Sequence, residues 1–167
     1  MSFSFLPEMV TDRVTDISPH FLRQKGIRLL MMDFDNTLVP YTTNTPTPAV
    51  EAWLKAMLQD GFAVCVVSNS RKSRVRVFCQ QYGITCFTHA RKPFSRGIQR
   101  CLAHYGLRPE ECALVGDQIY TDTLGANCAG VRSILVKAID NHNIWLKLRH
   151  VAEKPFIFAA RKRRISQ

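Results

Sequence analysis

The stretch RLLMMDFDNTLV, residues 28–39, places two aspartates, Asp33 and Asp35, in an otherwise apolar run. A buried carboxylate is costly unless it is paired or holds a metal, so either this run is not a strand or the acids have a function. Side chains two residues apart on an extended chain point the same way. We therefore expect both acids to face one pocket, with Phe34 packed behind them.

Further polar residues follow the other apolar runs, and they are Ser68, Asn69, Lys92, Asp117 and Asp122. Asp117 is expected to join the first two acids from a neighbouring strand. Clustered carboxylates repel each other unless a cation binds, and hard oxygen ligands select Mg²⁺. Asp122, five residues after Asp117, is a further ligand or holds a metal-bound water. The predicted metal site therefore consists of Asp33, Asp35, Asp117 and Asp122.

A metal, two carboxylates and a lysine suit phosphoryl transfer. The metal and Lys92 can neutralise phosphate charge. One carboxylate can attack phosphorus to form an aspartyl-phosphate, and a second can protonate the leaving oxygen and then activate water. Hydroxyl and backbone N–H groups bind phosphate oxygens, and Ser68, Asn69 and Lys92 are the predicted phosphate-binding residues.

Each of these residues also has a structural interpretation, which the sequence leaves open. Asp33 and Asp35 can form a solvated turn, and Asp117, which follows a glycine, can be a turn residue. Asp122 can cap a helix start. Asn69 serves structural bonding as readily as substrate contact.

The elements that must position these residues alternate between apolar runs and helix-like segments. The predicted strands are 27–33, 62–68, 84–88, 112–117 and 132–136. Helices are predicted from Pro19 toward Gly26, from Pro48 toward Gly61, and over 71–82, 94–105 and 119–128. Continuous apolar strands separated by helices imply a parallel sheet covered on both faces. We therefore predict an α/β fold of three layers (α/β/α, Rossmann-like) with a central parallel sheet of about five strands, whose carboxyl ends gather the polar residues.

Four motifs occur in order along these strands: DFDNT, VVSNS, ARKPF and GDQIYTD. Together they resemble the haloacid dehalogenase (HAD) superfamily of phosphatases. The resemblance implies Asp33 as the nucleophile and Asp35 as the general acid and base. It implies Ser68 and Lys92 as phosphate ligands, and Mg²⁺ held by Asp33, the Asp35 backbone carbonyl and Asp117.

Members of this family often carry an inserted cap domain, and the spacing here leaves no room for one. Only 32 residues separate Asp35 from Ser68 and 23 separate Ser68 from Lys92, and predicted helices and strands fill both gaps. The resemblance is therefore to the capless subclass III, with a HAD fold whose site is open to solvent. An open site suits a substrate too large to enclose, such as a protein, a nucleic-acid end or a lipid head group.

The net charge of +10 is a second feature that bears on partners. Such a chain can bind nucleic acid, an anionic membrane or acidic substrates. Near the pocket, we expect Arg71 and Lys72 to meet an anionic substrate, and Arg74 and Arg76 to lie on a solvated helix face. The six cysteines include no C-x-x-C pair, so we expect them to be buried and reduced.

The basic residues are densest toward the C-terminus. We predict residues 1–140 to form a single HAD-like phosphatase domain with an N-terminal leader, and residues 141–167 to form a basic amphipathic segment and tail. Such a segment can lie on an anionic membrane, whereas its structural alternative is a core-packing helix followed by a disordered tail. No apolar run has the length of a membrane span, so we expect a cytoplasmic protein, peripheral on the inner face of the membrane.

Four longer stretches narrow the resemblance: GIRLLMMDFDNTLV, ARKPF, GDQIYTDTLGAN and NHNIWLKLRH. They are similar to a capless branch of the family that includes phosphatidylglycerophosphate phosphatases. The resemblance implies a phospholipid head-group substrate at an anionic membrane surface, phosphatidylglycerol as product, and no nucleic acid. Two alternatives stay open: a HAD phosphatase of a soluble phosphosugar, nucleotide or phosphoprotein, and a basic RNA- or ribosome-binding module on a HAD scaffold.

Overall fold

The computed structural model describes residues 3–71 and 73–140. The predicted basic segment 141–167 lies outside the described residues, as does Lys72. Among the described residues, no helix combines the length and the apolar character that crossing a membrane requires.

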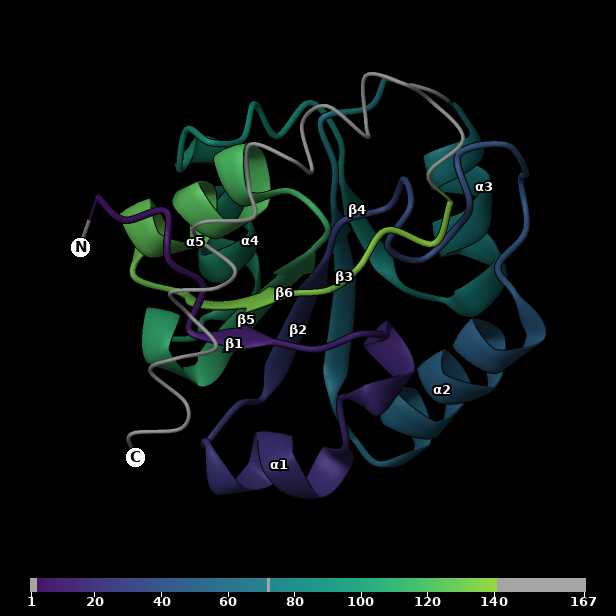
Figure 1. The fold of residues 1–167 in the computed structure, drawn as a ribbon, viewed down its shortest axis with the longest axis horizontal. Helices are drawn as coiled ribbons and strands as arrows, with labels where there is room; N and C mark the ends of the chain where they lie inside the picture. The colour runs from purple at the N-terminus through teal and green to yellow at the C-terminus, as the bar shows by residue number, and fades with distance from the viewer. Residues whose placement is uncertain (1–2, 72, 141–167) are drawn as a thin grey trace.

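The centre of the described chain is a six-stranded sheet in which every pairing is parallel (Figure 1). The strand order is β1-β6-β5-β2-β3-β4. The strands are β1 (Met9–Val10), β2 (Leu29–Met32), β3 (Ala63–Val67), β4 (Thr85–Phe87), β5 (Cys112–Gly116) and β6 (Arg132–Leu135). All five predicted strands are present. The sequence does not predict the sixth, β1, because two half-buried residues carry no periodic signal.

Four helices begin and end near their predicted positions, whereas the helix predicted over 119–128 begins at Leu124, after a π-helical turn. The helices are α1 (Pro19–Gln24), α2 (Pro48–Gln59), α3 (Ser73–Tyr82), α4 (Arg96–Tyr105) and α5 (Leu124–Ala129). Short 3-10 turns η1 (Val14–Asp16) and η2 (Pro109–Glu111) and a π-helical turn η3 (Ile119–Thr123) complete the order. The predicted caps are confirmed at α1 and α2, where the Ser18 and Thr47 hydroxyls accept backbone N–H groups three residues on. Gly106 ends α4 in the left-handed conformation.

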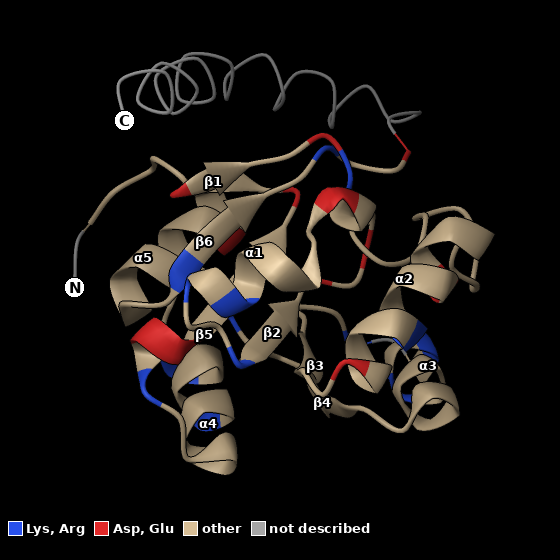
Figure 2. Cartoon of the chain, turned by 90° about the horizontal axis from the view of Figure 1, so that it is seen from below, with Lys and Arg blue, Asp and Glu red and all other residues tan. Residues whose placement is uncertain are grey.

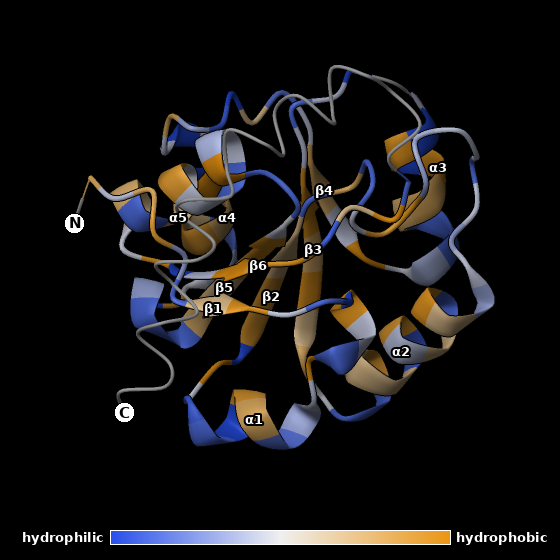
Figure 3. Cartoon of the chain, viewed as in Figure 1, coloured by the Kyte–Doolittle hydropathy of each residue, from blue (hydrophilic) through white to orange (hydrophobic). Residues whose placement is uncertain are grey.

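Two apolar cores lie on opposite faces of the sheet. Successive residues of β2 point to alternate faces, so Leu30 and Met32 pack with α1, α2 and α3, whereas Leu29 and Met31 pack with α4 and α5. The strands are the hydrophobic centre in Figure 3, and the helices flank them. The predicted three-layer α/β architecture is confirmed.

The crossover helices change face next to β2. The chain leaves β2 and β3 through α2 and α3 on one face, and reaches β5 through α4 on the other face. Because β2 and β5 are neighbours in the sheet, the connections diverge at their carboxyl ends, which is where open α/β sheets bind ligands. Asp33 and Asp117 directly follow these two strands.

No further domain interrupts the described chain at this edge. Between Asp35 and Ser68 it forms a loop, α2 and β3. Between Ser68 and Lys92 it forms α3, β4 and their connections. Membership of the capless subclass III stays a prediction.

Candidate active site

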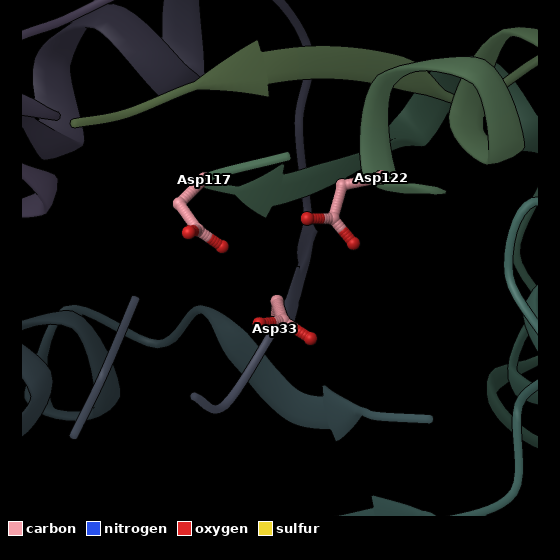
Figure 4. Close-up of side chains that lie close together, drawn as sticks. All are labelled: Asp33, Asp117 and Asp122. Atoms are coloured by element: carbon pink, nitrogen blue, oxygen red, sulfur yellow. The ribbon is translucent and has the colours of Figure 1, made fainter. Parts of the chain in front are cut away.

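Three buried carboxylates converge at the carboxyl edge of the sheet. Asp33 follows β2, Asp117 follows β5, and Asp122 lies in η3. Each offers an oxygen within 4.8 Å of the others, and Figure 4 shows the three side chains pointing toward one another. The Asp33 N–H donates to the carbonyl of Val115 at 2.8 Å, which locks this first acid to the neighbouring strand. Of the four acids that the sequence predicts at the metal site, these three therefore lie together.

The close approach of Asp122 depends on a glycine. A Cβ on Gly116, the last residue of β5, would collide with the Asp122 carboxylate. That carboxylate accepts the backbone N–H of Gln118 at 3.1 Å through Oδ2. The side chain therefore both fastens the start of η3 and reaches the acid cluster. The sequence shows Gly116 only as part of a motif and gives no signal of this contact.

Lys92 lies inside the acid cluster. Its Nζ is 2.7 Å from Asp33 Oδ1 and 2.6 Å from Asp122 Oδ1. Burial alone would lower the pKa of Lys92, but the neighbouring charges of Asp122 and Asp33 outweigh it and hold that pKa above its ordinary value. Burial raises the pKa of Asp33 to about 6, although the Lys92 charge opposes this rise. Asp33 is therefore ionised at neutral pH, and Lys92 is charged.

Asn69 holds the backbone of Lys92. Its Nδ2 donates to the Lys92 carbonyl at 2.9 Å, and its Oδ1 accepts the Lys92 N–H at 2.7 Å. This is the structural alternative that the sequence left open for Asn69. The side chain also lines the cavity described below, so contact with a phosphate stays a prediction.

Ser68 is buried where β3 ends. Its hydroxyl accepts the Ser70 N–H at 3.0 Å, and its backbone bonds to Phe87 and Ala90. These bonds fold the chain after β3 into a turn beside Asp33. Ser68 lines the cavity, and its contact with a phosphate stays a prediction.

Asp35 stands apart from the buried carboxylates. Its Oδ1 pairs with the Arg74 guanidinium at 2.9 Å, and the carboxylate does not belong to the cluster formed by the described residues. The Asp35 side chain therefore lies outside the acid cluster. Its backbone carbonyl stays the candidate metal ligand. Its side chain lines the wall of the cavity.

Arg74 does not lie on a solvated helix face, and that expectation is wrong. Its side chain is only 14% exposed and stacks over the ring of Phe34, with the guanidinium carbon 5.0 Å from the ring centroid. It also donates to the carbonyls of Pro40 and Tyr41. The reason is that α3 starts at the carboxyl edge of β3, so its first turn faces the loop that carries Asp35. Arg76, in contrast, is exposed as expected.

An open cavity of about 420 Å³ lies above the acids. The predicted residues Asp33, Asp35, Ser68, Asn69 and Lys92 all line it. Arg71 lines its wall, as expected, and Tyr41, Gln118 and Thr121 are lining residues that the sequence did not single out. The predicted catalytic and phosphate-binding residues therefore share one cavity.

The donor set fits a hard divalent cation. Lys92 contacts two of the three buried carboxylates, so its single positive charge offsets only part of their negative charge. Carboxylate oxygens are the ligands that Mg²⁺ prefers, and a second positive centre would relieve the repulsion between the acids.

Comparison with known proteins gives three findings at the level of sequence. A family model described as HAD-hydrolase-like matches residues 89–149. The chain is also 35% identical to the "Probable phosphatase YqeG" of Bacillus subtilis (strain 168) over 132 residues, which are 79% of this chain and 77% of that protein. The second match covers most of both proteins.

A more distant relative is the "Phosphatidylglycerophosphate phosphatase 1, chloroplastic/mitochondrial" of Arabidopsis thaliana, which is 25% identical over 161 residues. The match covers 91% of this chain but 43% of that protein, so the chain spans less than half the length of this relative. Among solved structures, the cobalt-bound deoxy-D-mannose-octulosonate 8-phosphate phosphatase of Haemophilus influenzae has a TM-score of 0.54 at 16% identity, covering 75% of each chain. At that identity the likeness shows the fold alone.

Proposed function

This chain belongs to the HAD-like phosphatases, and on that premise we propose that it is a Mg²⁺-dependent phosphomonoester hydrolase acting on phosphatidylglycerophosphate. The observation that carries the reaction type is the position of Asp33. This acid lies in an open cavity, 2.7 Å from the Lys92 ammonium and beside two further buried carboxylates. A carboxylate so placed can reach a phosphate that enters from solvent.

The proposed metal ligands are Asp33, Asp117 and the Asp35 backbone carbonyl. Mg²⁺ bound there would neutralise part of the negative charge of the phosphate. Asp122 already pairs with the Lys92 ammonium and accepts the Gln118 backbone N–H, so we assign it to holding Lys92 within the site. Lys92 then presents its charge to the phosphate oxygens, and Asn69 fixes the backbone that carries it.

The proposed reaction has two steps. An Asp33 carboxylate oxygen bonds to phosphorus as the ester P–O bond breaks, and Asp35 protonates the departing oxygen. Asp35 then takes a proton from water, whose oxygen attacks phosphorus and releases phosphate from Asp33. The Ser68 hydroxyl and Lys92 hold the phosphate oxygens through both steps. Arg74 keeps the Asp35 side chain at the cavity wall.

Three observations support a lipid substrate. The Arabidopsis relative named for phosphatidylglycerophosphate aligns with 91% of this chain. The cavity is open at the edge of the sheet, and among the described residues no inserted domain stands over it. The chain is strongly basic, with a net charge of +10, which favours an anionic surface.

The test is phosphate release from phosphatidylglycerophosphate in mixed micelles, measured against a panel of soluble phosphosugars, nucleotides and phosphopeptides. Wild-type protein with and without Mg²⁺ is compared with Asp33→Asn, which keeps the shape of the side chain and removes the nucleophile. We expect Mg²⁺-dependent release, faster on the lipid than on any soluble ester, and none from the variant.

The remaining outcomes separate the alternatives. Faster turnover of a soluble ester keeps the mechanism and discards the lipid. No release from any ester, together with salt-sensitive RNA binding that Asp33→Asn leaves unchanged, favours the RNA-binding module.

A further inference from the structure

One part of the chain carries positive charge without any acid. Residues 61–109 contain nine Lys or Arg and no Asp or Glu. This segment supplies β3, α3, β4 and α4, so one end of the sheet, beyond β2, is built from it. Figure 2 shows Lys and Arg on α3 and α4. The segment therefore has no acid of its own, and the acids that pair with its Arg74, Lys92 and Arg108 come from elsewhere in the chain.

Three exposed aromatic side chains lie in the loops that surround the cavity. Tyr41, in the loop after β2, is 53% exposed and lines the cavity. Phe94, two residues after Lys92, is 73% exposed. Tyr120 is 37% exposed in η3, between the cavity-lining Gln118 and Thr121. Each follows a different strand, yet all three strands are parallel, so the three rings share the carboxyl edge of the sheet.

Cations of the acid-free segment stand at the same edge. Arg71 lines the cavity after β3, and Arg91 precedes Lys92 after β4. Arg96 begins α4, which starts at this edge. All three are exposed. We name these three arginines together with Tyr41, Phe94 and Tyr120 the rim.

We propose that the rim docks on an anionic phospholipid bilayer, so that the cavity opens directly onto the membrane surface. The inference rests on the proposed lipid substrate and adds the face that meets the membrane. Aromatic rings settle at the boundary between head groups and acyl chains, where their apolar bodies leave water. Arginines beside them attract anionic head groups. A phosphate on the outermost part of a lipid then meets the cavity without the lipid leaving the bilayer.

The test measures binding of the full-length protein to vesicles of phosphatidylcholine with and without phosphatidylglycerol, by sedimentation. The apolar variant is Phe94→Ala with Tyr120→Ala. The charge variant is Arg91→Asn with Arg96→Ala, in which asparagine tolerates the positive φ of 56° at position 91. We expect each variant to bind the anionic vesicles about tenfold more weakly than wild type.

Two controls match these changes elsewhere on the surface. Val77→Ala removes a 61% exposed apolar side chain in the middle of α3. Lys25→Ala removes an exposed cation before β2, at the opposite edge of the sheet. Both controls should bind anionic vesicles as wild type does.

Activity separates this inference from the proposed function. Rim variants should hydrolyse a soluble phosphomonoester at the wild-type rate and vesicle-embedded lipid more slowly. Lipid hydrolysis combined with unchanged vesicle binding in both rim variants would overturn the docking surface and leave the proposed function standing. Rim-dependent vesicle binding without lipid hydrolysis would overturn the substrate and support the surface. Binding to RNA but not to anionic vesicles would also overturn it.

Discussion

The Asp33 carboxyl group is buried, and burial favours its protonated form over its ionised form. Burial raises its pKa to about 6 from an ordinary 3.8. A raised pKa means that the folded state prefers the protonated acid, so its contribution to stability is fully present below pH 3.8 and is lost as pH rises through about 6. Without Mg²⁺, ionisation of Asp33 therefore lowers the stability of the folded protein at neutral pH.

In the metal-free protein, Asp33→Asn should gain stability relative to wild type as pH rises through about 6, because asparagine does not ionise. We expect the Tm of the variant minus that of wild type, both in EDTA, to be higher at pH 7.5 than at pH 4.5 by roughly 5 °C. Thermal unfolding at both pH values checks this. A Tm difference that is the same at both pH values, or higher at pH 4.5, would contradict the assignment.

Arg74 is a positioning residue, since it touches Asp35 and the surrounding loop. Arg74→Ala should lower kcat about tenfold with a smaller change in KM, because the acid–base group loses its anchor. Arg74→Lys keeps the charge and should recover part of kcat. Steady-state kinetics on a soluble phosphomonoester measures both effects.

The matched control is Arg76→Ala, on the exposed face of the same helix, which should behave as wild type. If Arg74→Ala and Arg76→Ala have the same kcat, the contact between Arg74 and Asp35 has no part in turnover.

The chemistry of the site could be predicted from residue types and spacing, but its internal contacts could not. The D-x-D spacing and the strand ends placed Asp33, Asp117 and Lys92 correctly near one another. The partner of Asp35 depends on which turn of α3 faces the loop after β2, and that geometry is tertiary. The bonds from Asn69 to the Lys92 backbone likewise join two loops that no local pattern connects.

Among the elements, η3 is the one whose shape most affects the site. It brings Asp122 over the end of β5, in the space that a side chain at position 116 would fill. Local patterns predicted a plain helix over 119–128, because a π-helical turn has no distinct residue pattern. The strands and the other helices were predictable since long apolar runs, N-terminal prolines and C-terminal glycines are local signals.

Gly116→Ala should displace Asp122 and destabilise the fold by about 2 kcal/mol through overpacking. Chemical denaturation measures this loss, and activity should fall with it because Lys92 loses one of its two carboxylate partners. Gly106→Ala is the control. Its Cβ meets nothing within 4 Å, so only the left-handed backbone resists it, at a cost of about 1 kcal/mol, without loss of activity. Equal effects of the two variants on activity would refute the role of Gly116.

For the molecule as a whole, acid stability should depend on Glu111, at the end of η2. Its carboxylate accepts the backbone N–H and the side chain of Arg108, and it pairs with Arg28 just before β2. The Arg108 backbone hydrogen bond, followed by the two arginine side chains, lowers the pKa of Glu111 to about 2 from 4.5. A lowered pKa gives stability that is present above pH 4.5 and is lost as pH falls toward about 2.

Glu111→Gln should therefore be less stable than wild type at pH 7, and the difference should shrink as pH falls from 4.5 to about 2. Urea unfolding at a series of pH values gives the comparison. A gap that stays constant over this range would show that the ionised carboxylate contributes nothing.

The pairing of the edge strand β1 with β6 constrains the order in which the sheet can form during synthesis. Met9 and Val10 leave the ribosome early, yet their sheet partners are Ile134 and Leu135, and the Glu8 N–H bonds to the Ser133 hydroxyl across 125 positions. The β2–β3 pair can form during synthesis, whereas the outer edge of β6 cannot be covered until β6 itself has emerged. In a nascent chain, β1 therefore stays unpaired until β6 has been synthesised. A translational stall before residue 132 would leave β1 without its partner strand.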